Sequence, residues 1–169
     1  SSNVEYSNKI INDLLDYSGK IILDSKQKTN PKKILNYALE LVLIPENVEV
    51  INQIEETPEL TVDSTKMTRV FLNLIRNSID AMPEGGKIIL KSEQNKDAVK
   101  IILTDTGHGI SEEYQKNLFQ PLFTTKAKGM GFGLAISQRI IEAHQGEISV
   151  KSIVGVGTTF VIQLPLTQR

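Results

Sequence analysis

Two asparagines, Asn73 and Asn77, stand four residues apart in a segment whose apolar spacing predicts a helix. Side chains at this spacing share one helix face. Asparagine is a weak helix former, about 0.5 kcal/mol worse than alanine at an interior position. Its amide oxygen can bind Mg²⁺, which takes one or two protein oxygens together with water and substrate phosphates. An ordinary solvated face gives the same pattern, so the pair alone leaves both interpretations open.

An aspartate, Asp105, follows an apolar stretch and precedes two glycines, Gly107 and Gly109. A carboxylate only accepts hydrogen bonds, so in a pocket it could accept from the exocyclic amine of adenine. Guanine presents a carbonyl at that place, and the lost hydrogen bond would cost on the order of 2 kcal/mol. The glycines would let the backbone approach the base. Asp and Gly are also ordinary turn residues.

Glycines at alternate positions, Gly129, Gly131 and Gly133, lead into another predicted helix. A helix N-terminus presents free N–H groups and partial positive charge, which favours phosphate. Lys126 and Lys128 precede the glycines and add positive charge. The spacing matches neither the P-loop nor the dinucleotide fingerprint. A flexible surface loop is the alternative interpretation.

Hydrophobic periodicity predicts the elements that must position these groups. We expect helices over 4–25, 31–43, 65–82, 111–118 and 133–145, and strands over 48–54, 60–62, 87–93, 98–105, 147–152 and 158–164. Asn30 is the expected N-cap of the second helix, Asp63 or Ser64 that of the third, and Gly146 suits the last C-terminus. Residues 27–30 are polar and indicate a linker. Strand runs followed by covering helices predict an α+β two-layer sandwich, with a mixed sheet covered on one face by helices.

The composition excludes several classes of protein. The 169 residues carry 19 Lys and Arg against 20 Asp and Glu, so no bulk charge favours nucleic acid or an anionic membrane. The absence of cysteine excludes disulfides, Cys-ligated metal centres and thiol catalysis. Apolar runs such as residues 41–44 are far short of the roughly 18 residues of a membrane-spanning helix. Since the chain begins with Ser1 rather than methionine, we expect a piece of a longer protein.

The order of the motifs resembles that of the catalytic domain of sensor histidine kinases. In turn, the N, G1, F, G2 and last glycine boxes are matched by residues 73–81, 105–109, 119–126, 129–133 and 155–158. The resemblance implies the Bergerat-type ATP-binding fold, which type II topoisomerases, mismatch-repair ATPases and one class of chaperone share.

The resemblance also implies a role for each matching residue. Asn77 would ligate Mg²⁺, while Asn73 and Arg76 would lie near the phosphates of ATP. Asp105 would bind the adenine amine, with Thr158 alongside through a water. Residues 119–133 would form a lid, and the catalytic set would be Asn73, Arg76, Asn77 and Lys126. Further nucleotide contacts are implied for Gly107, Gly109, Ile110, Lys126, Gly129, Met130, Gly131, Phe132, Gly133 and Leu134.

Asn73 favours one activity within this superfamily. Relatives that hydrolyse ATP or phosphorylate serine carry a carboxylate four residues before the Mg²⁺ ligand, where it acts as general base. An amide cannot take that proton. The alternatives are a hydrolytic ATPase or serine/threonine kinase on the same fold, and a non-catalytic nucleotide-binding module.

Neither histidine matches the family's phosphoacceptor, which is followed by Glu or Asp. Gly109 follows His108, and Gln145 follows His144. His144 is expected in the last turn of a helix, where a partly charged imidazole suits the helix dipole. We therefore expect residues 1–28 to be a helical remnant of the dimerisation and phosphoacceptor hairpin plus a linker, and residues 29–169 to be the catalytic domain.

The implied activity is transfer of the γ-phosphoryl group of ATP to a histidine on a separate helical hairpin, in a two-component system. The implied partners are ATP with Mg²⁺, the hairpin of the parent kinase and a response-regulator receiver domain, but no nucleic acid. The resemblance further implies a homodimeric parent and a cytoplasmic location for this domain. Upstream segments would decide whether the parent is anchored in a membrane.

Overall fold

The computed structural model describes residues 2–121 and 133–167. Its centre is a five-stranded mixed sheet in the order β2-β4-β5-β7-β6. The strands are β2 (Val48–Gln53), β4 (Gly86–Gln94), β5 (Ala98–Asp105), β6 (Glu147–Ile153) and β7 (Gly157–Pro165). Only the β2–β4 pair is parallel, and the other three pairs of this sheet are antiparallel.

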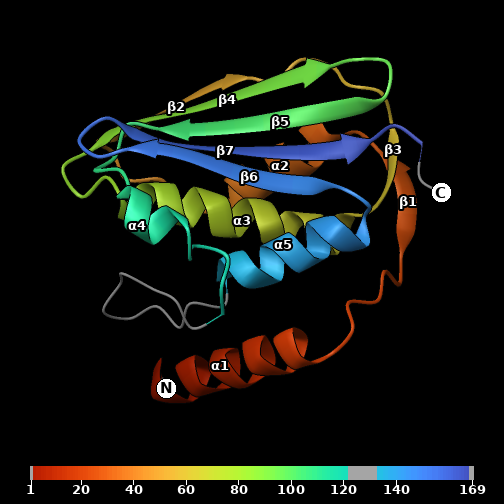
Figure 1. Ribbon diagram of the computed structural model, residues 1–169, viewed down its shortest axis with the longest axis horizontal. Helices are drawn as coiled ribbons and strands as arrows, with labels where there is room; N and C mark the ends of the chain where they lie inside the picture. Colours follow the sequence, from red (N-terminus) through yellow and green to blue (C-terminus); the bar gives the residue numbers. More distant parts are fainter. Residues whose placement is uncertain (1, 122–132, 168–169) are drawn as a thin grey trace.

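Helices cover one face of this sheet (Figure 1). They are α2 (Pro31–Leu41), α3 (Ser64–Asp80) and α5 (Gly133–Ala143). The short α4 (Glu112–Gln115) packs near β6, and α1 (Ser2–Ser18) lies on the outer side of the helical layer. The predicted two-layer α+β sandwich is therefore confirmed. Among the described residues, every helix is too short or too polar to cross a membrane.

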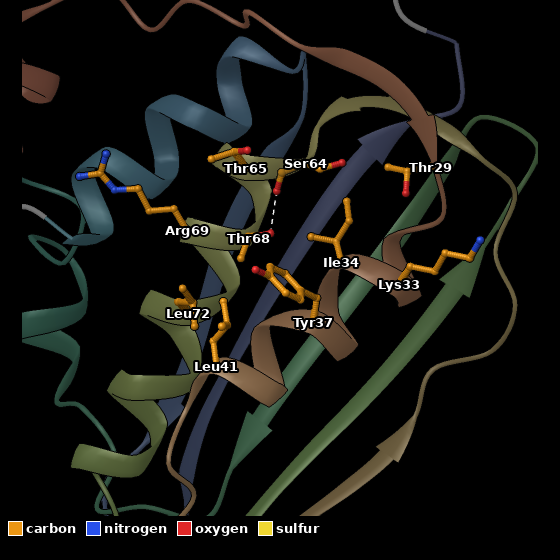
Figure 2. A pocket seen from close by; sticks show the side chains of 10 residues that line it. All are labelled: Thr29, Lys33, Ile34, Tyr37, Leu41, Ser64, Thr65, Thr68, Arg69 and Leu72. Atoms are coloured by element: carbon orange, nitrogen blue, oxygen red, sulfur yellow. Dashed lines mark hydrogen bonds between the residues drawn. The ribbon is translucent and has the colours of Figure 1, made fainter.

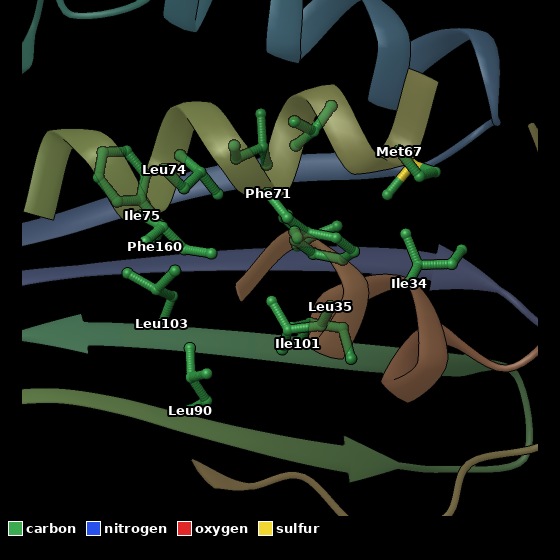
Figure 3. Close-up of a cluster of buried hydrophobic side chains, with 14 of the residues drawn as sticks. Ile34, Leu35, Met67, Phe71, Leu74, Ile75, Leu90, Ile101, Leu103 and Phe160 are labelled. Carbon is green, nitrogen blue, oxygen red and sulfur yellow. The ribbon is translucent and has the colours of Figure 1, made fainter. Parts of the chain in front are cut away.

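The core forms where the apolar side of α3 meets the sheet (Figure 3). Leu103 of β5 stands opposite Leu90 on β4 and Phe160 on β7, and all three side chains are buried. Phe71 and Leu74 of α3 are each about 1% exposed and belong to the same cluster. Because the apolar side of α3 faces the sheet, its other side is left for polar chemistry.

The predicted N-caps are confirmed, with Asp63 rather than Ser64 capping α3. Asp63 Oδ1 accepts from the N–H of Lys66 at 3.1 Å, and Asn30 Oδ1 accepts from that of Lys32 at 2.8 Å. Such caps satisfy N–H groups that have no partner inside the helix.

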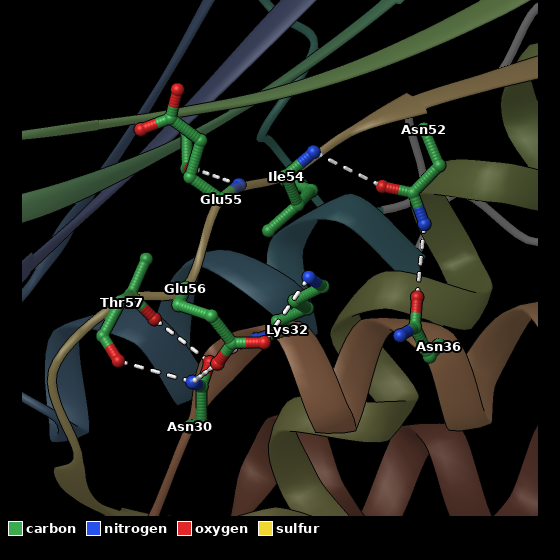
Figure 4. Close-up of polar contacts among 9 residues, drawn as sticks. Asn30, Lys32, Asn36, Asn52, Ile54, Glu55, Glu56 and Thr57 are labelled. Carbon is green, nitrogen blue, oxygen red and sulfur yellow. Dashed lines mark hydrogen bonds and ion pairs between the residues drawn. The ribbon is translucent and has the colours of Figure 1, made fainter.

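Asn30 also fixes the loop that follows β2 against α2 (Figure 4). Its Nδ2 donates to the backbone oxygen of Thr57 at 3.0 Å and to Glu56 Oε2 at 2.9 Å. Asn52 Nδ2 donates to Asn36 Oδ1 at 2.9 Å, which links β2 to the same helix. These contacts hold α2 in the layer beside α3.

Two expectations near the N-terminus are wrong. The helix expected over 4–25 ends at Ser18, and Gly19, a poor helix former, follows it. The expected linker instead contains strand β1 (Lys26–Thr29), which pairs antiparallel with β3 (Leu60–Asp63) in a separate two-stranded sheet. The side chains of β1 are largely exposed, so the strand has no apolar alternation that a sequence pattern could reveal.

The C-terminus of α5 differs in detail from the expectation. Gln145, not Gly146, adopts the left-handed conformation, with φ of 61°. The N–H of Gly146 donates to the oxygen of Ile141, and the N–H of Gln145 donates to that of Glu142, both at 2.9 Å. This pair of bonds is a Schellman motif.

His144 joins the end of α5 to the start of α3. Its ring is fully buried, its Nε2 accepts from the N–H of Asp63 at 2.9 Å, and its Nδ1 lies 2.8 Å from the oxygen of Ile140. These partners assign the proton to Nδ1. Burial lowers the pKa of His144, so the expected partly charged imidazole is wrong and the ring is neutral.

Candidate functional site

The polar side of α3 carries the predicted phosphate-binding residues. Asn73 and Asn77 are half-buried, whereas Arg76 is exposed. Asn73 Nδ2 donates to Ser137 Oγ of α5 at 3.3 Å. The hydrogen bond fixes the orientation of the Asn73 amide between the two helices.

The N-terminus of α5 lies directly beside Asn73. A Cβ atom at Gly133 would stand 2.4 Å from Asn73 Oδ1, so only glycine fits without a shift of the amide. Leu134 follows and packs on the hydrophobic core. The first N–H groups of α5, which have no partner within the helix, therefore belong to the same locality as the asparagine pair.

Several predicted residues lie outside the described part of the chain. These are Lys126, Gly129, Met130, Gly131 and Phe132, together with most of the expected lid.

Asp105 ends β5 as a buried carboxyl group, 3% exposed. Burial raises its pKa above the ordinary value. Hydrogen bonding opposes this shift because it favours the charged form: the N–H of Gly107 donates to Asp105 Oδ1 at 2.9 Å, and the backbone of Thr158 contributes as well. The carboxyl group is thus held in place with acceptor capacity to spare.

Ser78 is a member of this locality that sequence analysis missed. Its hydroxyl is fully buried and close enough to Asp105 to lower the pKa of that carboxyl group. Yet Ser78 Oγ makes no hydrogen bond of normal geometry within residues 2–121 and 133–167. Its position on the apolar side of α3 gave no sign of a polar role. A buried hydroxyl without a partner marks a place where a ligand or water can bind.

The glycine turn after Asp105 packs against the end of α3. A Cβ atom at Gly107 would stand 2.6 Å from the oxygen of Ala81, the residue that caps α3. The N–H of His108 donates to the same oxygen at 3.0 Å. Gly109 adopts a φ of 76° as the chain turns away. Asp105, the glycines and the last turn of α3 are therefore brought together, as the motifs predict.

The β6–β7 hairpin completes this end of the sheet. Thr158, which is buried, is the register partner of Asp105. Ser152 Oγ lies 2.7 Å from Thr158 Oγ1 and accepts from the N–H of Ile110 at 2.8 Å. Gln115 of α4 donates to the backbone oxygens of Ile110 and Ser152. Ser152 and Gln115 are isolated polar residues, and no pattern in the sequence singles them out.

Within the described residues, no group of three His, Cys, Asp or Glu side chains could hold a metal ion. A cation here would need an amide oxygen, such as that of Asn77, and oxygens supplied by a ligand.

A groove between α2 and α3 is separate from these residues (Figure 2). It has a volume of about 490 Å³, and its lining includes Tyr37 and Leu41 of α2 and Leu72 of α3. None of the predicted site residues lines it.

The comparisons with known proteins agree with this arrangement. A family model described as histidine kinase-, DNA gyrase B-, and HSP90-like ATPase matches residues 62–168. The chain belongs to this family. Sporulation kinase E of Bacillus subtilis (strain 168) is 41% identical over 125 residues, which are 73% of this chain and 17% of that protein. The signal transduction histidine-protein kinase AtoS of Escherichia coli (strain K12) is 36% identical over 171 residues, 98% of this chain and 28% of that protein. The chain thus spans less than a third of either relative.

Solved structures identify the type of domain within the family. The catalytic domain of histidine kinase ThkA is 29% identical, with a TM-score of 0.75 over 85% of this chain and 97% of that one. ThkA in complex with the response regulator protein TrrA is 26% identical, with a TM-score of 0.78 over 98% of this chain and 49% of that one. The chain is therefore an ATP-binding catalytic domain of the histidine kinase type, which confirms the resemblance.

Proposed function

We propose that this domain holds ATP with Mg²⁺ and presents the γ-phosphoryl group to a histidine on the helical hairpin of the parent kinase. The observation that carries the proposal is the buried Asp105 carboxyl group, with the buried Ser78 hydroxyl near it, at one end of the helix that bears Asn73 and Asn77.

The base-binding end is built to accept an amine. Asp105 supplies the acceptor, and Gly107 keeps the backbone close to the carboxyl group. Thr158, fixed by Ser152, stands next to Asp105 in the register. An adenine amine would find its acceptor here, whereas a guanine carbonyl would face another acceptor.

The phosphate-binding end combines neutral oxygens with positive charge. We assign Asn77 to Mg²⁺ through its amide oxygen, and Asn73, Arg76 and the N-terminus of α5 at Gly133 to the phosphates. Lys126 and the glycines before Gly133 belong to the same proposal. When bound, Mg²⁺ neutralises phosphate charge, which phosphoryl transfer through a loose transition state requires.

Asn73 supports transfer over hydrolysis. Its amide donates to Ser137 and its oxygen lies beside Gly133. It offers no carboxylate that could activate water. A histidine acceptor is nucleophilic when neutral, so positioning of the phosphate suffices.

The partners follow from the relatives. Both relatives are named as kinases, and one ThkA structure contains a response regulator protein. We propose a receiver domain as the final acceptor, a homodimeric parent and a cytoplasmic location for this domain. The division between hairpin remnant and catalytic domain would fall near residue 28, within β1, with α1 as the remnant.

Calorimetry and phosphotransfer together test this function. A non-hydrolysable ATP analogue with Mg²⁺ should bind, and the matching GTP analogue should bind at least tenfold more weakly. With ATP, label should appear on the histidine of a separately supplied hairpin from a relative. Rapid steady-state release of phosphate would indicate a hydrolytic ATPase, label on serine a serine kinase, and binding without transfer a non-catalytic module.

A further inference from the structure

Helix α1 is held against the domain with little apolar burial. None of its residues is buried, and Ile11, Leu14 and Leu15 are each more than half exposed. Tyr17, at the end of the helix, is half-buried and packs against the core, so apolar contact is confined to the last turn and polar contacts supply the rest.

Arg69 of α3 provides one of these contacts. Its guanidinium lies 2.8 Å from Asp13 Oδ1 and also pairs with the carboxylate of Asp16. Although Arg69 lies at the groove between α2 and α3, its side chain extends away from Tyr37 and Leu41 (Figure 2).

Arg139 of α5 provides the second contact. Its guanidinium donates to the backbone oxygens of Asp16, Tyr17 and Gly19, and it lies 5.4 Å from the centre of the Tyr17 ring. These oxygens stand at the end of α1, where carbonyl groups have no partner within the helix and attract positive charge. A planar fork with several donors suits this role better than an ammonium group.

Part of the contact between α1 and the domain is exposed enough for salt to weaken it. Arg69 and Asp16 are 39% and 42% exposed, and ion pairs with such exposure are weak and screened by salt. The Asp13 carboxylate is better protected, at 16% exposed, so we expect raised salt to weaken the attachment of α1 in part.

The two arginines also lie next to the proposed nucleotide site. Arg69 is one turn before Asn73 on α3, and Arg139 is two residues after Ser137, the partner of Asn73 on α5. Helix α1 thus bridges the same two helices that the nucleotide would bridge through Asn73 and the N-terminus of α5.

We propose that Arg69 and Arg139 are positioning residues that clamp the last turn of α1 and couple its docking to nucleotide binding. The inference rests on the proposed function. Nucleotide and α1 both favour the paired arrangement of α3 and α5, so each strengthens binding of the other. Coupling of this kind is reciprocal. Through α1, the contacts of Arg69 and Arg139 would make the position of the phosphoacceptor hairpin depend on whether nucleotide is bound.

Hydrogen exchange of the 169-residue chain tests the clamp. With a non-hydrolysable ATP analogue and Mg²⁺, amides in the C-terminal half of α1 should exchange about fivefold more slowly, a typical size for coupling between sites. Arg139→Gln and the double change Asp13→Asn with Asp16→Asn should abolish this slowing and weaken analogue binding by a similar factor. Lys151→Gln, a matched loss of charge on β6, should do neither.

The outcomes separate the two proposals. An analogue that binds the parent chain without slowing exchange in α1, or that slows it equally in Arg139→Gln, overturns the clamp and leaves the proposed function standing. An analogue that fails to bind the parent chain overturns both. Raised salt gives a second readout, because it should speed α1 exchange in the nucleotide-free chain and have less effect in the double variant.

Discussion

Asp105 is the buried side chain to which we assign the preference for adenine. Replacing it with asparagine keeps the shape but exchanges a charged acceptor for an amide whose NH₂ group can face the adenine amine. We expect Asp105→Asn to weaken ATP binding by about 2 kcal/mol or more, roughly 30-fold. Calorimetry measures this change, with Asp97→Asn in the exposed β4–β5 turn as the control. Unchanged affinity would remove Asp105 from the base site.

Ser78 allows a test that separates stability from binding. Its buried hydroxyl makes no hydrogen bond of normal geometry in the described structure and acts on Asp105 only through a poorly formed contact, so Ser78→Ala removes little from the fold. The free energy of unfolding should stay within about 0.5 kcal/mol or rise, while ATP affinity should fall about fivefold. Denaturant unfolding and calorimetry on the same samples measure both quantities. A destabilised variant with normal affinity would make Ser78 a structural residue only.

His144 should make stability depend on pH. Burial lowers its pKa in the folded state, so the unfolded chain binds the proton more readily. The contribution of neutral His144 to the free energy of unfolding is therefore fully present above the unfolded pKa of about 6.5. It is lost as the pH falls from about 6.5 towards the lower pKa of the folded state. Asp63 opposes the lowered pKa, while Lys26 and Lys66 add to it.

Denaturant unfolding between about pH 5 and pH 8 measures this dependence. His144→Gln should be less stable at pH 8, since the bonds to Asp63 and Ile140 are lost, but should show a flatter profile below pH 6.5. Parallel profiles for the variant and the parent chain would exclude His144 as the source.

At the level of elements, the contact between α3 and α5 should determine how well the residues assigned to the phosphates are positioned. Gly133→Ala would place a Cβ atom 2.4 Å from Asn73 Oδ1 and force the helices or the amide to shift. Overpacking of this kind destabilises a fold by about 1–3 kcal/mol. Because the groups that must shift are those assigned to the phosphates, we also expect ATP binding to weaken by roughly tenfold. Calorimetry measures the affinity, and denaturant unfolding on the same samples separates its loss from general destabilisation; unchanged ATP binding would exclude this contact from the phosphate site.

The elements that sequence patterns predicted are those whose local signals agree with their burial. Strand β5 alternates between buried and half-buried residues, β4 alternates in part, and Asp63 caps α3 next to a regular apolar stripe. Strand β1 has no buried face, so its pairing with β3 depends on the position of a distant segment. The left-handed Gln145 likewise violates the usual preference for glycine.

The residues of the candidate site also differ in whether a local pattern marks them. Asp105 and Asn77 could be chosen as candidates because each stands in a motif of distinctive composition. Ser78 and Ser152 become significant only when α3 and the β6–β7 hairpin are placed around Asp105. No local pattern encodes that proximity. Sequence could therefore supply candidates for the base-binding and phosphate-binding residues, but not the polar residues between them.

At the scale of the molecule, a two-layer sandwich brings distant segments to one end of the sheet. Asp105 ends β5, Thr158 begins the adjacent strand, and the last turn of α3 packs on the intervening glycine turn. Helix α1 lies outside this compact unit, attached through Arg69 and Arg139.

This arrangement predicts that the 169-residue chain does not phosphorylate itself. His144 is buried and both ring nitrogens are engaged, so its phosphorylation would require unfolding. His108 is exposed, but its Nδ1 lies 2.7 Å from the oxygen of Gly109, and the residue belongs to the glycine turn beside Asp105.

With γ-labelled ATP and Mg²⁺, we expect no stable label on the chain and label on a supplied hairpin, with Asn77→Ala abolishing transfer. His108→Ala should leave transfer to the hairpin within about twofold, because its ring is not assigned to the nucleotide. Acid-labile label on this chain that disappears in His108→Ala would contradict the assignment of the acceptor to another domain.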